Sequence, residues 1–220
     1  MDKEQLEQKL QKQLSKVVHA KSCFEIWRGL HEEFQQGGKS ENVFYQAPYF
    51  WKLTLKVFQE NFLLEMAKLY DEDKNSFGIK KTINTCEQNQ KIFPKEHEQV
   101  LYDHFNHKEV IRSNPVDMPS VLEKANNDYN AVHEQRKKLF LLRDKYLAHA
   151  DKKYAENPQT LYQEADLQSA DLETLLSVAG DILNSLLAAL CDRCVSTNHF
   201  NCDDYRHLLH VANSGIEKSK

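Results

Sequence analysis

The stretch SVLEKANNDYNAVHEQRKKLFLLRDKYLAHADKKYA, residues 120–155, predicts one long helix and decides the fold. It contains no glycine or proline, and its apolar side chains recur at helical spacing. These side chains are Leu122, Ala125, Tyr129, Val132, Leu139, Phe140, Tyr146, Leu147 and Ala150. Ser120 and Glu123 have the spacing of a capping box, so we expect the helix to begin at Ser120 and to continue uninterrupted to residue 155.

The apolar stripe of this helix includes a basic side chain. Steps of seven residues from Leu122 lead to Tyr129, Arg136, Arg143 and Ala150. We therefore expect Arg143 to point along the stripe. Because burial of an unpaired guanidinium costs several kcal/mol, Arg143 needs a partner carboxylate, an opening to solvent or an interface. A functional arginine at a cleft or a dimer seam meets that requirement.

The whole chain has the composition of an all-α protein. Its 220 residues include only 6 Gly and 5 Pro, which excludes collagen-like, low-complexity and all-β chains. We expect a single domain over residues 1–220, an up-and-down bundle of six or seven helices with 120–155 as the long central motif-bearing helix, and no strand. The other helices are expected at 3–36, at 43–70 (apolar on most sides), at 79–93, after Pro94, from Ser169 to Leu190, and as a short helix with a tail within 197–220.

Charge and cysteine content narrow the class of protein further. The net charge of −4 excludes a basic surface over the whole chain. The polar N-terminus is not a signal peptide, and no apolar run approaches the roughly 18–20 residues that span a bilayer. The five cysteines are sparse and odd in number, which favours reduced thiols. We therefore expect a cytoplasmic protein without membrane contact.

One basic island stands out from this acidic chain. Residues 136–153 hold seven basic and two acidic side chains, a local charge of +5 that leaves −9 for the rest. The basic side chains are Arg136, Lys137, Lys138, Arg143, Lys145, Lys152 and Lys153. Such an island suits a phosphate-bearing ligand. The alternative is a solvated helix face with i,i+4 ion pairs, which composition alone favours.

Within the island, residues 143–149 have the sequence RDKYLAH, an Arg and a His separated by five residues with a polar residue after the Arg. This pattern resembles the signature of HEPN-domain proteins. The longer string LRDKYLAHADK (142–152) and the aromatic-rich FWKLTLKVFQENFLLEMAKLYDED (50–73) resemble the abortive-infection, phage-resistance branch of that superfamily. The resemblance covers roughly residues 43–190.

The resemblance implies a metal-independent endoribonuclease without a cofactor, a toxin or effector in phage defence that acts as a homodimer with one shared cleft. RNA supplies its own nucleophile, the 2′-OH. By resemblance, His149 is the general base or acid and Arg143 binds the phosphate and stabilises the transition state. Positions 143 and 149 lie about 120° apart around an ideal helix, so they converge only across a dimer axis or if the helix loosens near His149.

The remaining residues of the motif are expected to assist. Accessory candidates are Asp144, Lys145 and Tyr146, and the predicted RNA-binding residues are Arg136, Lys137, Lys138, Lys152 and Lys153. Asp144 repels a phosphate unless it orients His or Lys, and its alternative is a structural ion pair with Lys145 or Lys138. Tyr146 lies on the apolar stripe, which favours a core position.

Two alternatives come from other classes. The first is a non-catalytic helical module that binds a nucleotide, a nucleic acid or a partner protein such as a nucleotidyltransferase antitoxin. The second is a metal site at Cys191, Cys194, His199 and Cys202, whose spacing admits tetrahedral zinc. Its first half overlaps a predicted helix and no glycine permits tight turns, so buried helix cysteines are the favoured interpretation and no metal is expected.

Overall fold

The computed structural model describes residues 1–37, 40–73, 75–103, 108–148, 164–197, 202 and 204–218. The chain forms two compact units. Unit 1 is drawn from residues 1–15, 68–136 and 168–195, and unit 2 from residues 16–67, 137–167 and 196–220. Three helices, α1, α3 and α6, contribute residues to both units. The expectation of one domain over the whole chain stays a prediction.

The predicted all-α class is confirmed, with eight α-helices among the described residues. They are α1 (Lys3–Gln36), α2 (Glu41–Gln46), α3 (Pro48–Tyr70), α4 (Ile79–Gln88), α5 (Met118–Ala131), α6 (His133–Leu142), α9 (Ser169–Cys191) and α10 (Asp204–Lys218). A 3₁₀ turn covers Gln90–Ile92, and a π-helix covers Arg143–Ala148. Helices α1 and α9 lie where the sequence predicts them.

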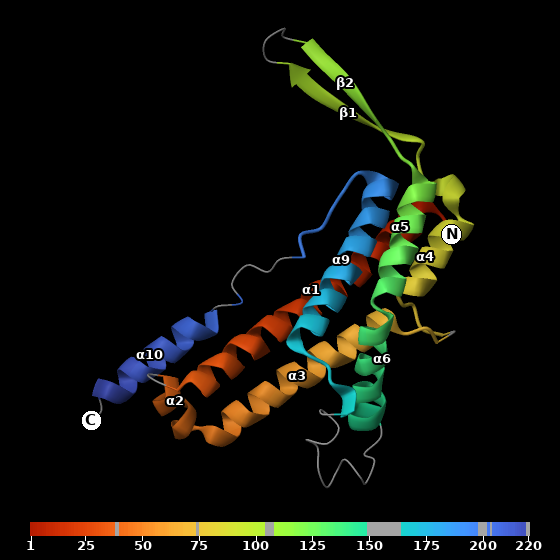
Figure 1. Ribbon diagram of the computed structural model, residues 1–220. Helices are drawn as coiled ribbons and strands as arrows, with labels where there is room; N and C mark the ends of the chain where they lie inside the picture. Colours follow the sequence, from red (N-terminus) through yellow and green to blue (C-terminus); the bar gives the residue numbers. More distant parts are fainter. Residues whose placement is uncertain are drawn as a thin grey trace. The chain divides into compact units, whose positions relative to one another are not determined.

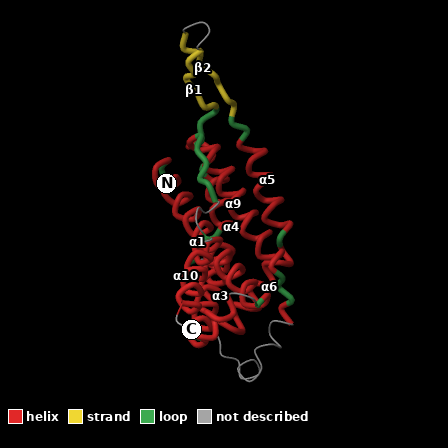
Figure 2. The backbone as a smooth tube through the Cα atoms, turned by 90° about the vertical axis from the view of Figure 1, so that its left-hand side faces the viewer, coloured by secondary structure: helices red, strands yellow, loops and turns green. Residues whose placement is uncertain are grey.

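The prediction of a helix after Pro94 is wrong, because this segment forms a β-hairpin. Strand β1 (Glu96–Asp103) pairs antiparallel with β2 (Lys108–Pro115), and Figure 2 shows both in yellow. Each strand carries β-branched or aromatic residues that favour extended backbone. The Val116 N–H donates to the Lys95 carbonyl at 2.9 Å and closes the base of the hairpin. His97 Nε2 donates to the Ala189 carbonyl at 3.1 Å and ties that base to α9.

The predicted continuity of residues 120–155 is also wrong. The helix begins at Met118, and its N-cap is Asp117, whose carboxylate accepts the Ser120 N–H at 3.3 Å. A turn at Val132 then separates α5 from α6 without any glycine or proline. The helix predicted at residues 43–70 is also divided, because α2 ends before Ala47 and α3 begins at Pro48. Proline fits a first helical position, where its missing N–H is not needed.

Unit 1 is built around α9, which packs with α4 and α5 (Figure 1). Its Leu175, Leu183, Leu186 and Leu187 are fully buried. By length and composition α9 is the one helix in the described part of the chain that could cross a membrane, but more than half of that segment is buried in protein. The hydroxyl of Tyr70 donates to the Leu175 carbonyl at 2.6 Å. Helix α9 is therefore the core helix of unit 1.

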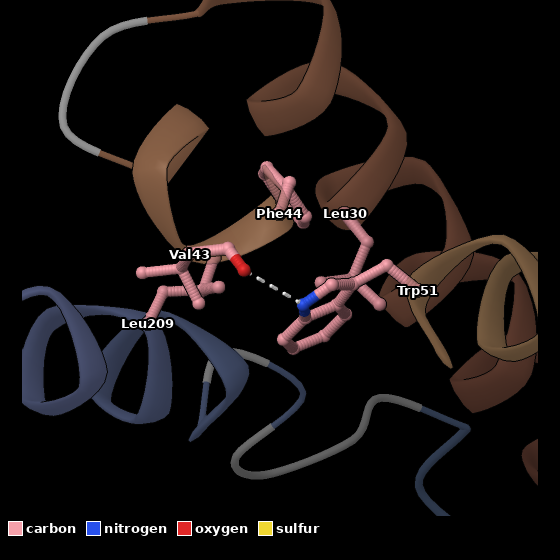
Figure 3. Packing of buried hydrophobic residues seen from close by; sticks show 5 residues of the cluster. All are labelled: Leu30, Val43, Phe44, Trp51 and Leu209. Atoms are coloured by element: carbon pink, nitrogen blue, oxygen red, sulfur yellow. Dashed lines mark hydrogen bonds between the residues drawn. The ribbon is translucent and has the colours of Figure 1, made fainter. Parts of the chain in front are cut away.

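Unit 2 has a separate core in which aromatic rings meet. Phe24 of α1 contacts Phe62 of α3 edge to face, with ring centres 5.4 Å apart. Farther along, α1, α2, α3 and α10 contribute to one buried cluster, Leu30, Val43, Phe44, Trp51 and Leu209 (Figure 3). The Trp51 indole Nε1 donates to the Val43 carbonyl at 3.2 Å. This hydrogen bond joins α3 to α2 across the break between the two helices.

Two glycines test how α10 packs against α1. A Cβ at Gly29 would lie 2.0 Å from the Tyr205 hydroxyl oxygen, whereas a Cβ at Gly215 meets nothing within 4 Å. We expect Gly29→Ala to lower the free energy of unfolding by about 1–3 kcal/mol, since the Tyr205 ring must move. The control Gly215→Ala should raise it by about 0.5–1 kcal/mol through helix propensity. Urea unfolding of the two variants measures both values, and equal effects would contradict this packing.

Candidate functional site

The apolar stripe of α5 and α6 buries Arg136. The residue is 6% exposed, and its Nη1 lies 2.7 Å from Glu72 Oε1. Its guanidinium carbon lies 3.9 Å from the ring centre of Tyr129. The Tyr129 hydroxyl donates to the same Glu72 Oε1 at 2.8 Å. We call these three residues the Glu72 network, and they supply the partner carboxylate that a buried guanidinium requires.

The Glu72 network keeps its carboxyl ionised and its phenol neutral. The hydrogen bond from Tyr129, with the bond and charge of Arg136, holds the pKa of Glu72 below its ordinary value despite partial burial. Burial, followed by the hydrogen bond to Glu72, raises the pKa of Tyr129 far above that of a free phenol. Arg136 is thus a structural cation in unit 1, and the predicted role of Arg136 as an RNA contact does not fit its buried position.

The helix changes character at Arg143. Residues 143–148 form a π-helix, whose turn is wider than that of α6 before it. Turns of this kind are rare and occur frequently at functional sites. A helix loosened near His149 was one of two ways for the motif to converge, and the loosening is observed up to Ala148. His149 itself lies outside the described residues.

The guanidinium of Arg143 is held by its own neighbour in sequence. Its Nε and Nη2 lie 2.7 and 2.6 Å from Asp144 Oδ1. Its carbon lies 4.6 Å from the ring centre of Phe140, one turn earlier. The Arg143 side chain is 29% exposed, so solvent reaches it. Asp144 therefore forms an ion pair with the Arg143 guanidinium, the group that was expected to bind phosphate. This pairing was not expected from the sequence.

The other predicted site residues fall into two groups. Of those described, Lys137 is exposed, Lys145 is half-buried, and Lys138 lies 3.6 Å from Asp166. The backbone of Tyr146 belongs to the π-helix. His149, Lys152 and Lys153 lie outside the described residues. The structure thus places Arg143 and Asp144 together in unit 2 and leaves the pairing of Arg143 with His149 a prediction.

The cysteines do not form a metal site in the described part of the chain. No group of three or more His, Cys, Asp or Glu side chains there could hold a metal ion. Cys191 Sγ donates to the Leu187 carbonyl at 3.2 Å, as a helix thiol does, and burial raises its pKa. Cys194 is exposed, Cys202 is half-buried, and His199 lies outside the described residues. The contacts of Cys191 therefore do not support the zinc alternative.

Unit 2 contains an apolar cavity that the sequence did not predict. Its volume is about 400 Å³, and its walls come from α1, α2 and α3. The lining residues are His31, Phe34, Phe44, Tyr45, Pro48, Trp51, Lys52 and Leu55. The aromatic run on either side of Pro48 was the available signal, but only the break between α2 and α3 turns those rings toward one space. Its titratable lining residues are His31, Tyr45 and Lys52.

Comparison with known proteins gives one match. A family model described as AbiU2, of HEPN type, covers residues 3–208, which is nearly the whole chain. The match extends beyond residues 43–190, where the sequence resemblance was strongest, and includes α1 and part of α10. No curated protein and no solved structure matches the chain.

The Glu72 network makes a prediction about acid stability. Its carboxyl pKa is lowered in the folded chain, so its contribution is full above the ordinary value of 4.5 and is lost as pH falls through the lowered value. We expect Glu72→Gln to lower the free energy of unfolding at pH 7 by roughly 0.5–1.5 kcal/mol, because Arg136 loses its charged partner while solvent screens the exposed Glu72 side chain.

Urea unfolding at pH 7 and below pH 4.5 measures this contribution. The Glu72→Gln variant should lose less stability on acidification than the wild-type chain does. Glu123→Gln, an exposed position on α5, is the matched control and should behave as wild type at both pH values. Identical acid profiles for Glu72→Gln and Glu123→Gln would contradict a structural role for the network.

Proposed function

The chain belongs to the AbiU2 family of HEPN-type abortive-infection proteins, and from this premise we propose that it is a metal-independent endoribonuclease in phage defence. The observation that carries the proposal is the position of the motif. Arg143 begins a π-helix that ends at Ala148, directly before His149 in the sequence. A rare helix form that begins at the motif arginine supports a functional role for this segment.

The proposed chemistry needs only side chains and the substrate. The RNA 2′-OH attacks the adjacent phosphorus, a base removes its proton, and an acid protonates the departing 5′-oxygen. His149 takes the proton-transfer roles, because imidazole titrates near neutrality. Arg143 binds the phosphoryl oxygens and stabilises the charge that develops on them. No cofactor is required for these steps.

The surroundings of Arg143 support phosphate binding. Its guanidinium rests on the Phe140 ring and on Asp144, so its orientation is restricted before a substrate arrives. A preoriented charge loses less conformational freedom on binding than a mobile one does. Asp144 is the group that a phosphate must displace or share, because its Oδ1 contacts both Nε and Nη2 of Arg143.

We propose further that the active form is a homodimer with one composite site. Each copy would contribute an Arg143 and a His149 to a shared cleft, which resolves the separation of the two positions around a single helix. Lys137, Lys152 and Lys153 extend the proposed RNA contact, with Lys138 and Lys145 beside it. An antitoxin protein that restrains the activity is part of the same proposal, and the protein acts in the cytoplasm.

The Arg143–Asp144 ion pair also favours a second candidate function. A salt bridge that neutralises Arg143 suits a helical module that binds a nucleotide, a nucleic acid or a partner protein without catalysis. In that case Arg143 has a structural role. The two functions differ in the effect of Arg143→Ala, which abolishes catalysis in a folded chain under the first and loosens the fold or the dimer under the second.

RNA cleavage in EDTA tests the first function. We expect wild-type protein to cleave RNA without added metal, and Arg143→Ala and His149→Ala to lower kcat/KM by at least about 100-fold, through lost charge stabilisation and proton transfer. Lys124→Ala, which removes an exposed basic side chain of α5 paired with Asp128, is the matched control and should cleave at the wild-type rate. Equal activity in every variant, or a strict metal requirement, would refute the proposal.

Asp144 gives a separate prediction about binding. In a His149→Ala background, which stops turnover, Asp144→Asn should tighten the binding of a short single-stranded RNA by about 3–10-fold at low salt, because phosphate no longer competes for Arg143. Asp128→Asn removes one negative charge from α5 and should leave affinity unchanged. Fluorescence anisotropy measures both, and weaker binding by Asp144→Asn would show that Asp144 positions Arg143 instead of competing with the substrate.

A further inference from the structure

Helix α3 leaves one apolar face uncovered. Its Trp51, Phe62, Leu63 and Met66 are buried in unit 2. On the other side, five large apolar side chains between 37% and 79% exposed point away from that core. These residues are Tyr49, Phe50, Leu53, Val57 and Leu64, and we call them the α3 face. Exposed apolar surface of this extent marks an interaction site.

The spacing of the α3 face is that of a helix-pairing seam. Phe50, Val57 and Leu64 are separated by seven residues each, and Leu53 lies between the first two. Apolar residues at such positions form one stripe along a helix, and stripes of this kind pair helices. From Phe50 to Leu64 the stripe extends over about 21 Å at 1.5 Å per residue. It is long enough to pack along a second helix for several turns.

Charge along α3 selects the direction of pairing. The N-terminal half carries Lys52 and Lys56, and the C-terminal half carries Glu60, Glu65 and, in the last turn, Lys68. Lys56 and Glu60 lie 3.7 Å apart at the boundary of the two halves. An antiparallel second α3 would set the acidic half of one helix against the basic half of the other. A parallel copy would set like charges side by side, which is unfavourable.

We propose that the α3 face is the interface between two copies of this chain, packed antiparallel about a two-fold axis at Val57. Phe50 then lies against Leu64 of the second copy, and the two Val57 side chains meet at the axis. A two-fold interface requires a surface complementary to itself, and a mainly apolar stripe with Lys56 before its centre and Glu60 after it has that property. The inference gives the dimer of the proposed function an interface, but it does not depend on RNA cleavage.

The oligomeric state of designed variants tests the interface. We expect wild-type protein to be a dimer by light scattering coupled to gel filtration. Val57→Asp should raise the dissociation constant by at least about tenfold, because it sets two carboxylates against each other at the axis. Leu208→Asp replaces an exposed apolar residue of α10 and is the matched control, which should remain dimeric. Circular dichroism should show both variants folded, since each position is exposed.

Cysteine cross-linking tests the direction of pairing, and its result cannot be confused with unfolding of a variant. In a chain with the exposed Cys194 replaced by Ser, Val57→Cys should form a covalent dimer by itself. A mixture of Phe50→Cys and Leu64→Cys chains should cross-link, while Phe50→Cys alone should not. Covalent dimers from Phe50→Cys alone, without those from the mixture, would overturn the antiparallel arrangement.

The outcomes separate the interface from the enzyme. A monomeric wild-type chain, or a dimer that Val57→Asp leaves intact, would overturn the interface and would assign the α3 face to a different protein partner. A monomeric Val57→Asp chain that still cleaves RNA would uphold the interface and refute the composite dimer site. A monomeric Val57→Asp chain that no longer cleaves would support both.

Discussion

The ion pair between the buried Arg136 and the solvent-exposed Glu72 is the interaction on which the motif helix depends. A guanidinium that is 6% exposed is tolerated only with a partner charge nearby. Arg136 Nη1 lies 2.7 Å from Glu72 Oε1, and the guanidinium carbon lies 3.9 Å from the ring centre of Tyr129. Arg136 lies in the first turn of α6, directly after the break at Val132. The pair therefore adds a tertiary contact to the first turn of α6, and Arg143 follows seven residues later in the same chain segment.

The sequence predicted the elements that one physical signal defines. Helix α1 follows from an uninterrupted apolar stripe that ends before two glycines, and α9 follows from its leucine seam. The hairpin was missed because its β-branched residues are mixed with charges that also suit a helix. The break at Val132 was missed because no glycine or proline marks it. Tertiary packing, and not a local breaker, makes that turn.

The exposure of Arg143 shows why steps of seven residues do not predict burial along the whole motif helix. A straight α-helix drifts about 20° for every seven residues, so steps of seven from Leu122 no longer follow one line by the third step. The first two steps end at the buried Tyr129 and Arg136, and the third ends at an Arg143 that solvent reaches. The expectation for Arg143 is met, because it has a partner carboxylate and access to solvent, whereas the sequence did not single out Arg136 as the more deeply buried arginine. Glu72 could not be found this way, because 64 residues separate it from Arg136.

The motif itself was predictable from residue types and spacing, whereas its setting was not. The π-helix and the Arg143–Asp144 pair arise from backbone geometry that RDKYLAH does not specify.

The chemical groups at the ends of the cleaved RNA test the proposed mechanism most directly. Attack by the 2′-OH predicts a 2′,3′-cyclic phosphate on one fragment and a 5′-hydroxyl on the other, formed in EDTA, and mass spectrometry of the fragments identifies both. Fragments with 3′-hydroxyl and 5′-phosphate ends would contradict a metal-independent mechanism through Arg143 and His149.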